Sequence, residues 1–311
     1  MTVVIYIVLC LCAATFAVAT AVRAAWYARA PMHLRWELYP VPHEAPGRAA
    51  HGGSHFEEAG TMAAPVRHHW GTMKALAAEV LTLKALGDTN RPLWWRSYPF
   101  HVGLYLLVAA VPLVAAEAAL TIWGPAVLDG GFGTALGGLV RVVGLAGVVL
   151  TPAGAAALLH RRLTDPDLRA STTPGDLFNL AAFIVALTTL GLGFALRPAG
   201  TAGPLDVAVG LLTWSPTLAL APVAAAGVVL SALLAAYIPF THMSHFVGKY
   251  FTYHAVRWDD AANRPGGSIE KTMAEYLTYR PTWGATHVGA DGTRTWADIA
   301  ASAPPSDKTT R

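Results

Sequence analysis

Cysteine is nearly absent from this chain, which has only Cys10 and Cys12, both inside the same apolar run. An iron–sulfur cluster takes about four thiolates, and covalent haem attachment takes a Cys-x-x-Cys-His motif, so the chain can supply neither. Any cluster that works with this chain must belong to a partner protein. The sequence also lacks a Gly-rich phosphate loop, a His-Glu-x-x-His zinc motif, a Ser-His-Asp arrangement with usable spacing and an internal repeat.

Charged residues are scarce as well. They make up 13% of the chain against 54% hydrophobic residues, and the mean hydropathy is +0.43. A soluble domain carries about 25% charged residues, so this composition predicts an integral membrane protein. The net charge of +3 does not indicate a nucleic-acid partner, because the basic residues gather between apolar runs and at their ends, where they orient a membrane protein.

Five apolar runs are long enough to cross a bilayer, since a span takes roughly 20 residues for about 30 Å of hydrocarbon. Over such lengths only a helix satisfies every backbone group inside lipid. The sequence therefore predicts an all-α integral membrane protein with five transmembrane helices. The runs comprise residues 3–22, 100–122, 134–159, 177–196 and 217–240.

The distribution of basic residues predicts the orientation. Residues 23–98 and the link at 161–169 are rich in arginine, whereas the turns at 124–133 and 197–216 hold one basic residue between them, Arg197. No basic residue precedes the first run, which is typical of an uncleaved anchor. The positive-inside rule then places the amino terminus outside and the carboxyl terminus in the cytoplasm, with a long inner loop between the first two helices. We expect a multi-pass protein of the cytoplasmic membrane.

The same pattern predicts four segments. Residues 1–30 form an amino-terminal transmembrane anchor, and residues 31–98 form a cytoplasmic loop with an interfacial helix at 72–86, where apolar residues are spaced for one helical face. Residues 99–246 form a four-helix membrane bundle. Residues 247–311 form a polar tail containing several tryptophan and tyrosine residues, and this composition indicates docking on a partner protein.

Three of the twelve histidines lie at the ends of apolar runs. His101 opens the second run, and His242 and His245 close the fifth, so five crossings place all three at the same membrane face. Imidazoles from two helices, His101 with either of the others, can hold one haem iron in a six-coordinate state without an open position for oxygen chemistry, as one-electron transfer requires. The alternative is that these histidines only form hydrogen bonds with the backbone or with lipid.

Short motifs near these positions resemble a known family. They are FHVG from position 100, RRLTDP from position 161 with RAST from position 169, and PFT from position 239 followed by His245. In this order, across roughly residues 95 to 255, they resemble the gamma, or cytochrome b, subunit family of respiratory nitrate reductase. The chain is also similar to the membrane cytochrome b of sulfite-reduction-associated complexes and of complexes with heterodisulfide-reductase-like iron–sulfur proteins.

The resemblance implies a ligand set for haem b. His101 and His245 match the inner-side ligands of the family's second and fifth helices, and His242 is the lesser candidate. The family's outer haem takes histidines at positions that are Val111 and Gly227 here, and neither can bind iron. We therefore expect one haem b, on the cytoplasmic side, unless a second one has unusual ligands.

The resemblance also implies the electron path. The chain passes electrons between the quinone pool and a cytoplasmic iron–sulfur subunit, heterodisulfide-reductase-like or nitrate-reductase-beta-like, and terminal catalysis lies on other subunits. A quinone is expected close to His101 or His245. Arg96, Lys249 and His242 are candidates for binding haem propionates or a quinone carbonyl, although each could instead anchor lipid headgroups.

Glu117 and Arg141 are the only charged residues well inside the expected spans. They lie roughly 8 and 10 Å below the outer ends of their runs, and this matching depth predicts an intramembrane pair. A polar clasp between helices is favoured slightly over a proton path or an outer quinone site, because no haem is expected nearby.

Two other functions compete with the cytochrome hypothesis. The first is a haem-free membrane anchor subunit of a similar complex, in which the histidines are remnants. The second is a small transporter or channel, which requires several polar groups along a midplane path. The spans offer only Glu117 and Arg141 for that purpose, so the second is disfavoured.

Overall fold

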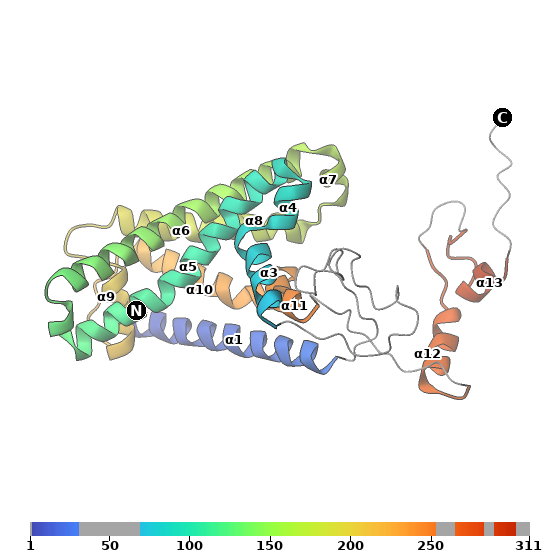
Figure 1. Ribbon diagram of the computed structural model, residues 1–311, viewed down its shortest axis with the longest axis horizontal. Helices are drawn as coiled ribbons and strands as arrows, with labels where there is room; N and C mark the ends of the chain where they lie inside the picture. Colours follow the sequence, from blue (N-terminus) through green and yellow to red (C-terminus); the bar gives the residue numbers. More distant parts are fainter. Residues whose placement is uncertain (1, 31–68, 253–264, 283–288, 303–311) are drawn as a thin grey trace. The chain divides into compact units, whose positions relative to one another are not determined.

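Helices account for every regular element in the described part of the chain, which comprises residues 2–30, 69–252, 265–282 and 289–302 of a computed structural model (Figure 1). The chain divides into two compact units. Met1–Arg29 and Trp36–His254 form the first unit, and Ala30–Arg35 and Ala255–Arg311 form the second. Most of the predicted inner loop, residues 31–68, lies outside the described residues.

Five helices of the first unit are long and apolar enough to cross a membrane, as predicted, and the chain is a multi-pass membrane protein. The orientation of these helices remains a prediction. The 3-10 helix η2 (Ile238–Phe240) extends the last of them. The five are α1 (Thr2–Arg29), α5 (Arg91–Trp123), α6 (Gly131–Thr164), α8 (Pro174–Ala195) and α10 (Pro222–Tyr237).

Shorter helices connect the long ones and form the described part of the second unit. In the first unit these are α3 (His69–Thr82), α4 (Lys84–Thr89), η1 (Pro125–Leu128), α7 (Pro166–Ser171), α9 (Pro204–Thr213), η3 (His242–Ser244) and α11 (His245–Thr252). In the second unit they are α12 (Ser268–Leu277) and α13 (Trp296–Ala301).

The predicted interfacial helix at 72–86 is wrong in its extent, because the structure divides it into α3 and α4. Leu83 has a φ of 50°, in the left-handed region that an α-helix cannot contain. The indole Nε1 of Trp94 donates a hydrogen bond of 2.8 Å to the Thr82 carbonyl, which a continuing helix would use internally. A hydrogen bond from α5 therefore accompanies the end of α3. The spacing of apolar residues along the sequence gives no sign of this contact.

Two long helices also begin elsewhere than predicted. Helix α5 starts at Arg91 instead of residue 100, since the Asn90 side chain accepts a hydrogen bond of 3.1 Å from the Leu93 amide and caps it. Helix α10 starts only at Pro222, because the residue before a proline is restricted to extended backbone, as Ala221 shows with a ψ of 140°. The stretch before it passes close to α9, a helix that the apolar runs did not predict.

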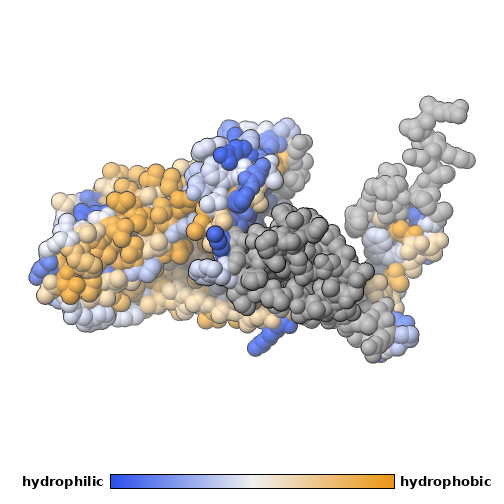
Figure 2. All heavy atoms as spheres, in the orientation of Figure 1, coloured by the Kyte–Doolittle hydropathy of each residue, from blue (hydrophilic) through white to orange (hydrophobic). Residues whose placement is uncertain are grey.

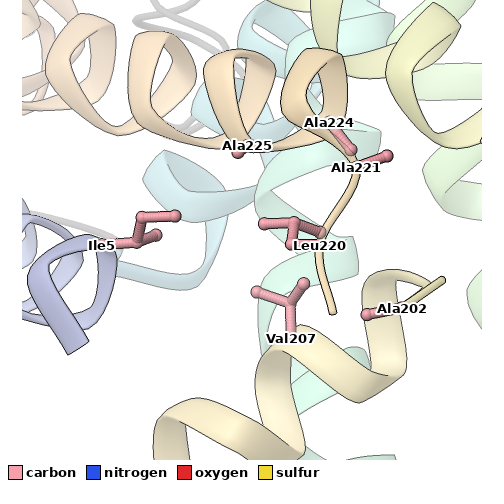
Figure 3. Close-up of a cluster of buried hydrophobic side chains, with 7 residues drawn as sticks. All are labelled: Ile5, Ala202, Val207, Leu220, Ala221, Ala224 and Ala225. Carbon is pink, nitrogen blue, oxygen red and sulfur yellow. The ribbon is translucent and has the colours of Figure 1, made fainter. Parts of the chain in front are cut away.

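Two buried apolar clusters hold the first unit together. One gathers Ile5 of α1, Val207 of α9 and Ala224 of α10 with the segment leading into α10, as Figure 3 shows. The other contains Phe183 of α8 and Leu234 of α10, together with a buried alanine of α6, and Phe100 of α5 packs against it. The second cluster therefore lies directly beside His101.

Glycines allow α5 and α6 to approach until their backbones touch. A Cβ at Gly103 would lie 2.5 Å from the Thr151 amide nitrogen, and one at Gly154 would lie 2.5 Å from the Phe100 amide nitrogen. Small residues at such crossings are the usual basis of helix packing in lipid, where no hydrophobic force acts between helices. This contact fixes the depth of the α5 segment that carries His101.

Large apolar side chains remain exposed along the long helices, Val108, Val142 and Leu145 among them. In Figure 2 apolar residues gather over α5 and α6, whereas hydrophilic residues gather near α4 and α7. Such a surface is consistent with lipid contact along the spans.

Candidate functional site

His101 and His245 lie next to each other. Their ring centres are 6.4 Å apart, and the ring planes form an angle of 62°. His101 lies in the third turn of α5. His245 does not close the fifth long helix as expected. Helix α10 ends at Tyr237, two 3-10 turns follow, and His245 begins the separate short helix α11.

The Nδ1 atom of each ring is fixed by a backbone carbonyl. The His101 Nδ1 is 2.8 Å from the Ser97 carbonyl oxygen, with the Ser97 hydroxyl 3.3 Å away, and the His245 Nδ1 is 3.2 Å from the His242 carbonyl oxygen. A carbonyl only accepts hydrogen bonds, so Nδ1 carries the proton in each neutral ring and Nε2 keeps its lone pair. Within the described residues neither Nε2 has a hydrogen-bond partner.

This pair fits axial ligation of a haem iron. Metal-binding histidines usually donate their other ring N–H to a backbone carbonyl or a carboxylate, which fixes the tautomer and the ring orientation. Two imidazoles on opposite sides of one metal ion, with metal–nitrogen distances of about 2 Å and a further ~1 Å to each ring centre, place those centres roughly 6 Å apart. Among the described residues no three His, Cys, Asp or Glu side chains converge.

Aromatic rings enclose His101 on α5. The Phe100 ring centre is 5.4 Å from that of His101 at 87°, and the Tyr105 ring centre is 6.3 Å away at 55°. The Tyr105 hydroxyl donates a hydrogen bond of 2.7 Å to the Val80 carbonyl in α3. Helix α3 is thereby attached beside the histidine pair.

An ion pair attaches α3 to α11 as well. Lys249 Nζ lies 3.1 Å from Glu79 Oε1, with both side chains partly exposed, and Glu79 Oε2 accepts a hydrogen bond of 2.9 Å from the Ala85 amide. Lys249 was expected to bind a haem propionate or a quinone, and the structure shows its charge already balanced by Glu79. Helix α3 thus has two polar links to α5, through Trp94 and Tyr105, and one to α11, through Lys249.

Helix α1 supports α11 from another side. The Tyr27 ring stacks on Phe251 with centres 6.0 Å apart and an angle of 13°. Gly248 lies opposite the Tyr27 hydroxyl, which would be 3.2 Å from a Cβ at that glycine. The position of His245, one turn before Gly248, therefore depends on a helix that starts far away in the sequence.

Two other predicted residues have partners elsewhere. His242 is 66% exposed, and its Nε2 lies 3.7 Å from Asp176 Oδ1 at the start of α8. Arg96 donates a hydrogen bond of 2.7 Å to the Pro92 carbonyl of its own helix. The structure brings neither side chain into a contact with the histidine pair in the described part of the chain.

Glu117 and Arg141 approach the same glycine. A Cβ at Gly137 would lie 3.0 Å from Glu117 Oε1 and 3.8 Å from Arg141 Nη2. Arg141 Nε also donates a hydrogen bond of 3.0 Å to the Gly137 carbonyl. The two charges thus lie at one α5–α6 contact, although no ion pair joins them among the described side chains.

Val111 and Gly227 stand where the resembled family has the ligands of its outer haem. Val111 is exposed on α5. Gly227 is buried between α10 and α8, where a Cβ would lie 2.4 Å from the Leu190 Cα. Close packing of α8 and α10 occupies the place where the resemblance puts a second ligand.

The residues that hold the histidines in place were not predicted from the sequence. Ser97 and Tyr105 lie four residues before and after His101, hence on the same helical face, and that spacing was a usable signal. Glu79 and Tyr27 act across long sequence separations, and no pattern in the chain indicated them. Comparison of the chain with protein-family models, with curated proteins and with solved structures gives no match.

Proposed function

We propose that this chain is the haem b subunit of a membrane oxidoreductase complex, with His101 and His245 as the axial ligands of one haem. The observation that carries this proposal is the pair itself. Two rings from separate helices lie 6.4 Å apart, each with Nδ1 bound to a backbone carbonyl and Nε2 unused among the described residues. A bound haem would supply one-electron transfer.

The residues around the pair orient the two imidazoles for that transfer. Ser97 and the His242 carbonyl hold the two imidazoles in the tautomer that presents Nε2. Hydrogen bonding at Nδ1 raises the basicity of a ligating imidazole and tunes the metal. Tyr105 and Lys249 attach α3 beside the pair.

We further propose that electrons pass between the quinone pool and an iron–sulfur partner subunit. The chain cannot hold a cluster itself, since its two cysteines lie in α1. The second unit offers a docking surface for a partner, because Met273, Tyr276 and Tyr279 are exposed in or next to α12. Exposed apolar side chains close together are typical of protein interaction sites.

We place the chain in the cytoplasmic membrane with its carboxyl terminus in the cytoplasm, as a relative of the nitrate reductase gamma family. The distribution of arginines supports this orientation. The close packing at Gly227 supports a single haem. Reporter fusions at either terminus test the orientation, and the haem-to-protein ratio of the purified protein tests the count. A ratio of two would contradict the single site.

The visible and EPR spectra of the purified protein test the central claim. We expect a reduced α band of the b type and a low-spin oxidised signal in the wild type. Both should be lost in His101→Ala and in His245→Ala. The matched control is His242→Ala, three residues from His245 and directed at Asp176, which should keep the full spectrum. Absence of the band from folded wild-type protein would refute haem binding.

A haem-free anchor subunit is the second candidate function. A centre separation of 6.4 Å also falls within the range of about 4.5–7 Å for ordinary aromatic pairs, so the two imidazoles can pack on each other without a metal. In that case His101→Phe leaves assembly with the partner intact. Under the haem proposal the same substitution abolishes quinol-dependent electron transfer.

A further inference from the structure

A groove of about 530 Å³ runs between α1 and η2 in the first unit. Ala19, Val22, Arg23 and Trp26 line one side at positions i, i+3, i+4 and i+7, and therefore on a single face of α1. Pro239 and Phe240 line the other side. Three of these side chains are large, apolar and mostly exposed, with relative exposures of 63% for Val22, 65% for Trp26 and 64% for Phe240.

The groove lies at the level where a bilayer changes from hydrocarbon to headgroups. Arg23 is about 32 Å along α1 from Thr2, close to the roughly 30 Å thickness of the hydrocarbon core. Trp26 follows one turn later, and tryptophan is enriched at that boundary. The apolar part of the groove thus borders the hydrocarbon, and its cationic end borders the headgroups.

Arg23 is the charged residue of the groove lining, and the lining contains no carboxylate. In the described part of the chain Arg23 forms no ion pair and no hydrogen bond through its guanidinium group. A guanidinium group binds phosphate through two parallel hydrogen bonds, and such charge-assisted bonds are about twice as strong as neutral ones. A free guanidinium group above an apolar channel is complementary to an anion that carries a hydrocarbon chain.

We propose that this groove binds an anionic phospholipid, with its phosphate on Arg23 and an acyl chain between α1 and η2. Basic pockets next to transmembrane helices bind such headgroups in this way. The site is separate from the histidine pair and does not depend on the proposed function. Its effect is to join α1 to the turn that leads into α11.

Lipid retention and thermal stabilisation of the full-length protein test the proposal. The protein is purified in mild detergent and titrated with phosphatidylglycerol or phosphatidylcholine, and bound lipid is counted by native mass spectrometry. We expect phosphatidylglycerol to bind the wild type and Arg23→Lys. Binding should fall about tenfold in Arg23→Gln, which loses the charge-assisted contact.

Arg29→Gln is the matched control, because it removes the same charge from the last turn of the same helix, outside the groove. Arg29 lies about 9 Å further along α1. That distance exceeds the screening length of roughly 3 to 8 Å that applies between 1 M and 0.15 M salt. In about 0.5 M salt, Arg29→Gln should therefore bind phosphatidylglycerol nearly as the wild type does.

Three outcomes would overturn the proposal. The first is equal binding of phosphatidylglycerol and phosphatidylcholine by the wild type, which also decides the matter if Arg23→Gln does not fold. The second is an equal loss in Arg23→Gln and Arg29→Gln. The third is displacement of the lipid by an isoprenoid quinone at lower concentration than phosphatidylglycerol, which would assign the groove to the quinone.

Discussion

The contact between Gly154 of α6 and Phe100 of α5 gives a sharp prediction for the membrane bundle. In Gly154→Ala the new Cβ would lie 2.5 Å from the Phe100 amide nitrogen and 2.7 Å from its Cα, whereas ordinary contacts begin at 3.4 Å. These two atoms belong to the backbone, and the third close atom, the Phe100 Cβ at 2.7 Å, is fixed by the backbone, so no side-chain rotation relieves the overlap. The two helices must separate by about 1 Å at the residue before His101.

The magnitude follows from two opposing effects. Overpacking costs about 1–3 kcal/mol of unfolding free energy, whereas alanine gains about 1 kcal/mol over glycine within a helix. Gly144→Ala provides the matched control on the same helix, since no atom lies within 4 Å of a Cβ there. Gly144→Ala should therefore be neutral or slightly stabilising, with Gly154→Ala about 1–3 kcal/mol less stable than this control.

Thermal unfolding followed by tryptophan fluorescence measures the difference. For a domain of this size the two variants should differ in Tm by roughly 2 to 12 °C. If the proposed haem is present, the haem-to-protein ratio should fall in Gly154→Ala alone, because the displaced segment carries His101. Equal melting temperatures for the two variants would refute the close helix contact.

Three further predictions concern other contacts. Lys249→Met should lower the unfolding free energy by at most about 1 kcal/mol, because the Glu79 pair is partly exposed, and thermal scans should show the loss shrinking in high salt. Gly210→Ala would put a Cβ 2.2 Å from the Tyr6 hydroxyl, so it should lower the Tm. Adding Tyr6→Phe removes that hydroxyl and should restore part of the loss. A double variant with no higher Tm would contradict the close contact between Gly210 and Tyr6. Hydrogen bonds from Thr295, the cap of α13, lower the pKa of Asp298. The stabilisation by this cap should therefore be complete above the ordinary carboxyl pKa and be lost as the pH falls through the lowered pKa. An NMR titration of the Asp298 carboxyl group with an ordinary midpoint would contradict this.

The sequence predicted the long helices because lipid leaves the backbone no other way to satisfy its hydrogen bonds. Their ends were less predictable, since caps and contacts with neighbouring helices decide them. Asn90 extends α5 beyond its apolar run, and the indole of Trp94 takes the carbonyl at which α3 ends. Local hydrophobicity contains no information about either contact.

In the candidate site, too, one part could be predicted from the sequence and another could not. The apolar boundaries were enough to predict that His101 and His245 share one end of the bundle. The choice between His242 and His245 depends on two 3-10 turns that follow the end of α10, and Thr241 caps the second of them by accepting a hydrogen bond of 3.1 Å from the Met243 amide. Those turns direct His242 toward Asp176 and His245 toward His101. Turn geometry of this kind follows from tertiary contacts, so helical spacing alone cannot give it.

The short helix α11 is a separate element from the span that precedes it, and this separation bears on how the protein is assembled. Tyr237 ends that span, and His245 lies beyond two tight turns on a segment of eight residues. The ring of His245 can therefore be displaced by opening α11 at the bilayer surface, while α10 stays inserted. Under the proposed function, the haem would enter after the five crossings have been completed, and its exchange would be governed by local opening of α11 and not by unfolding of the bundle.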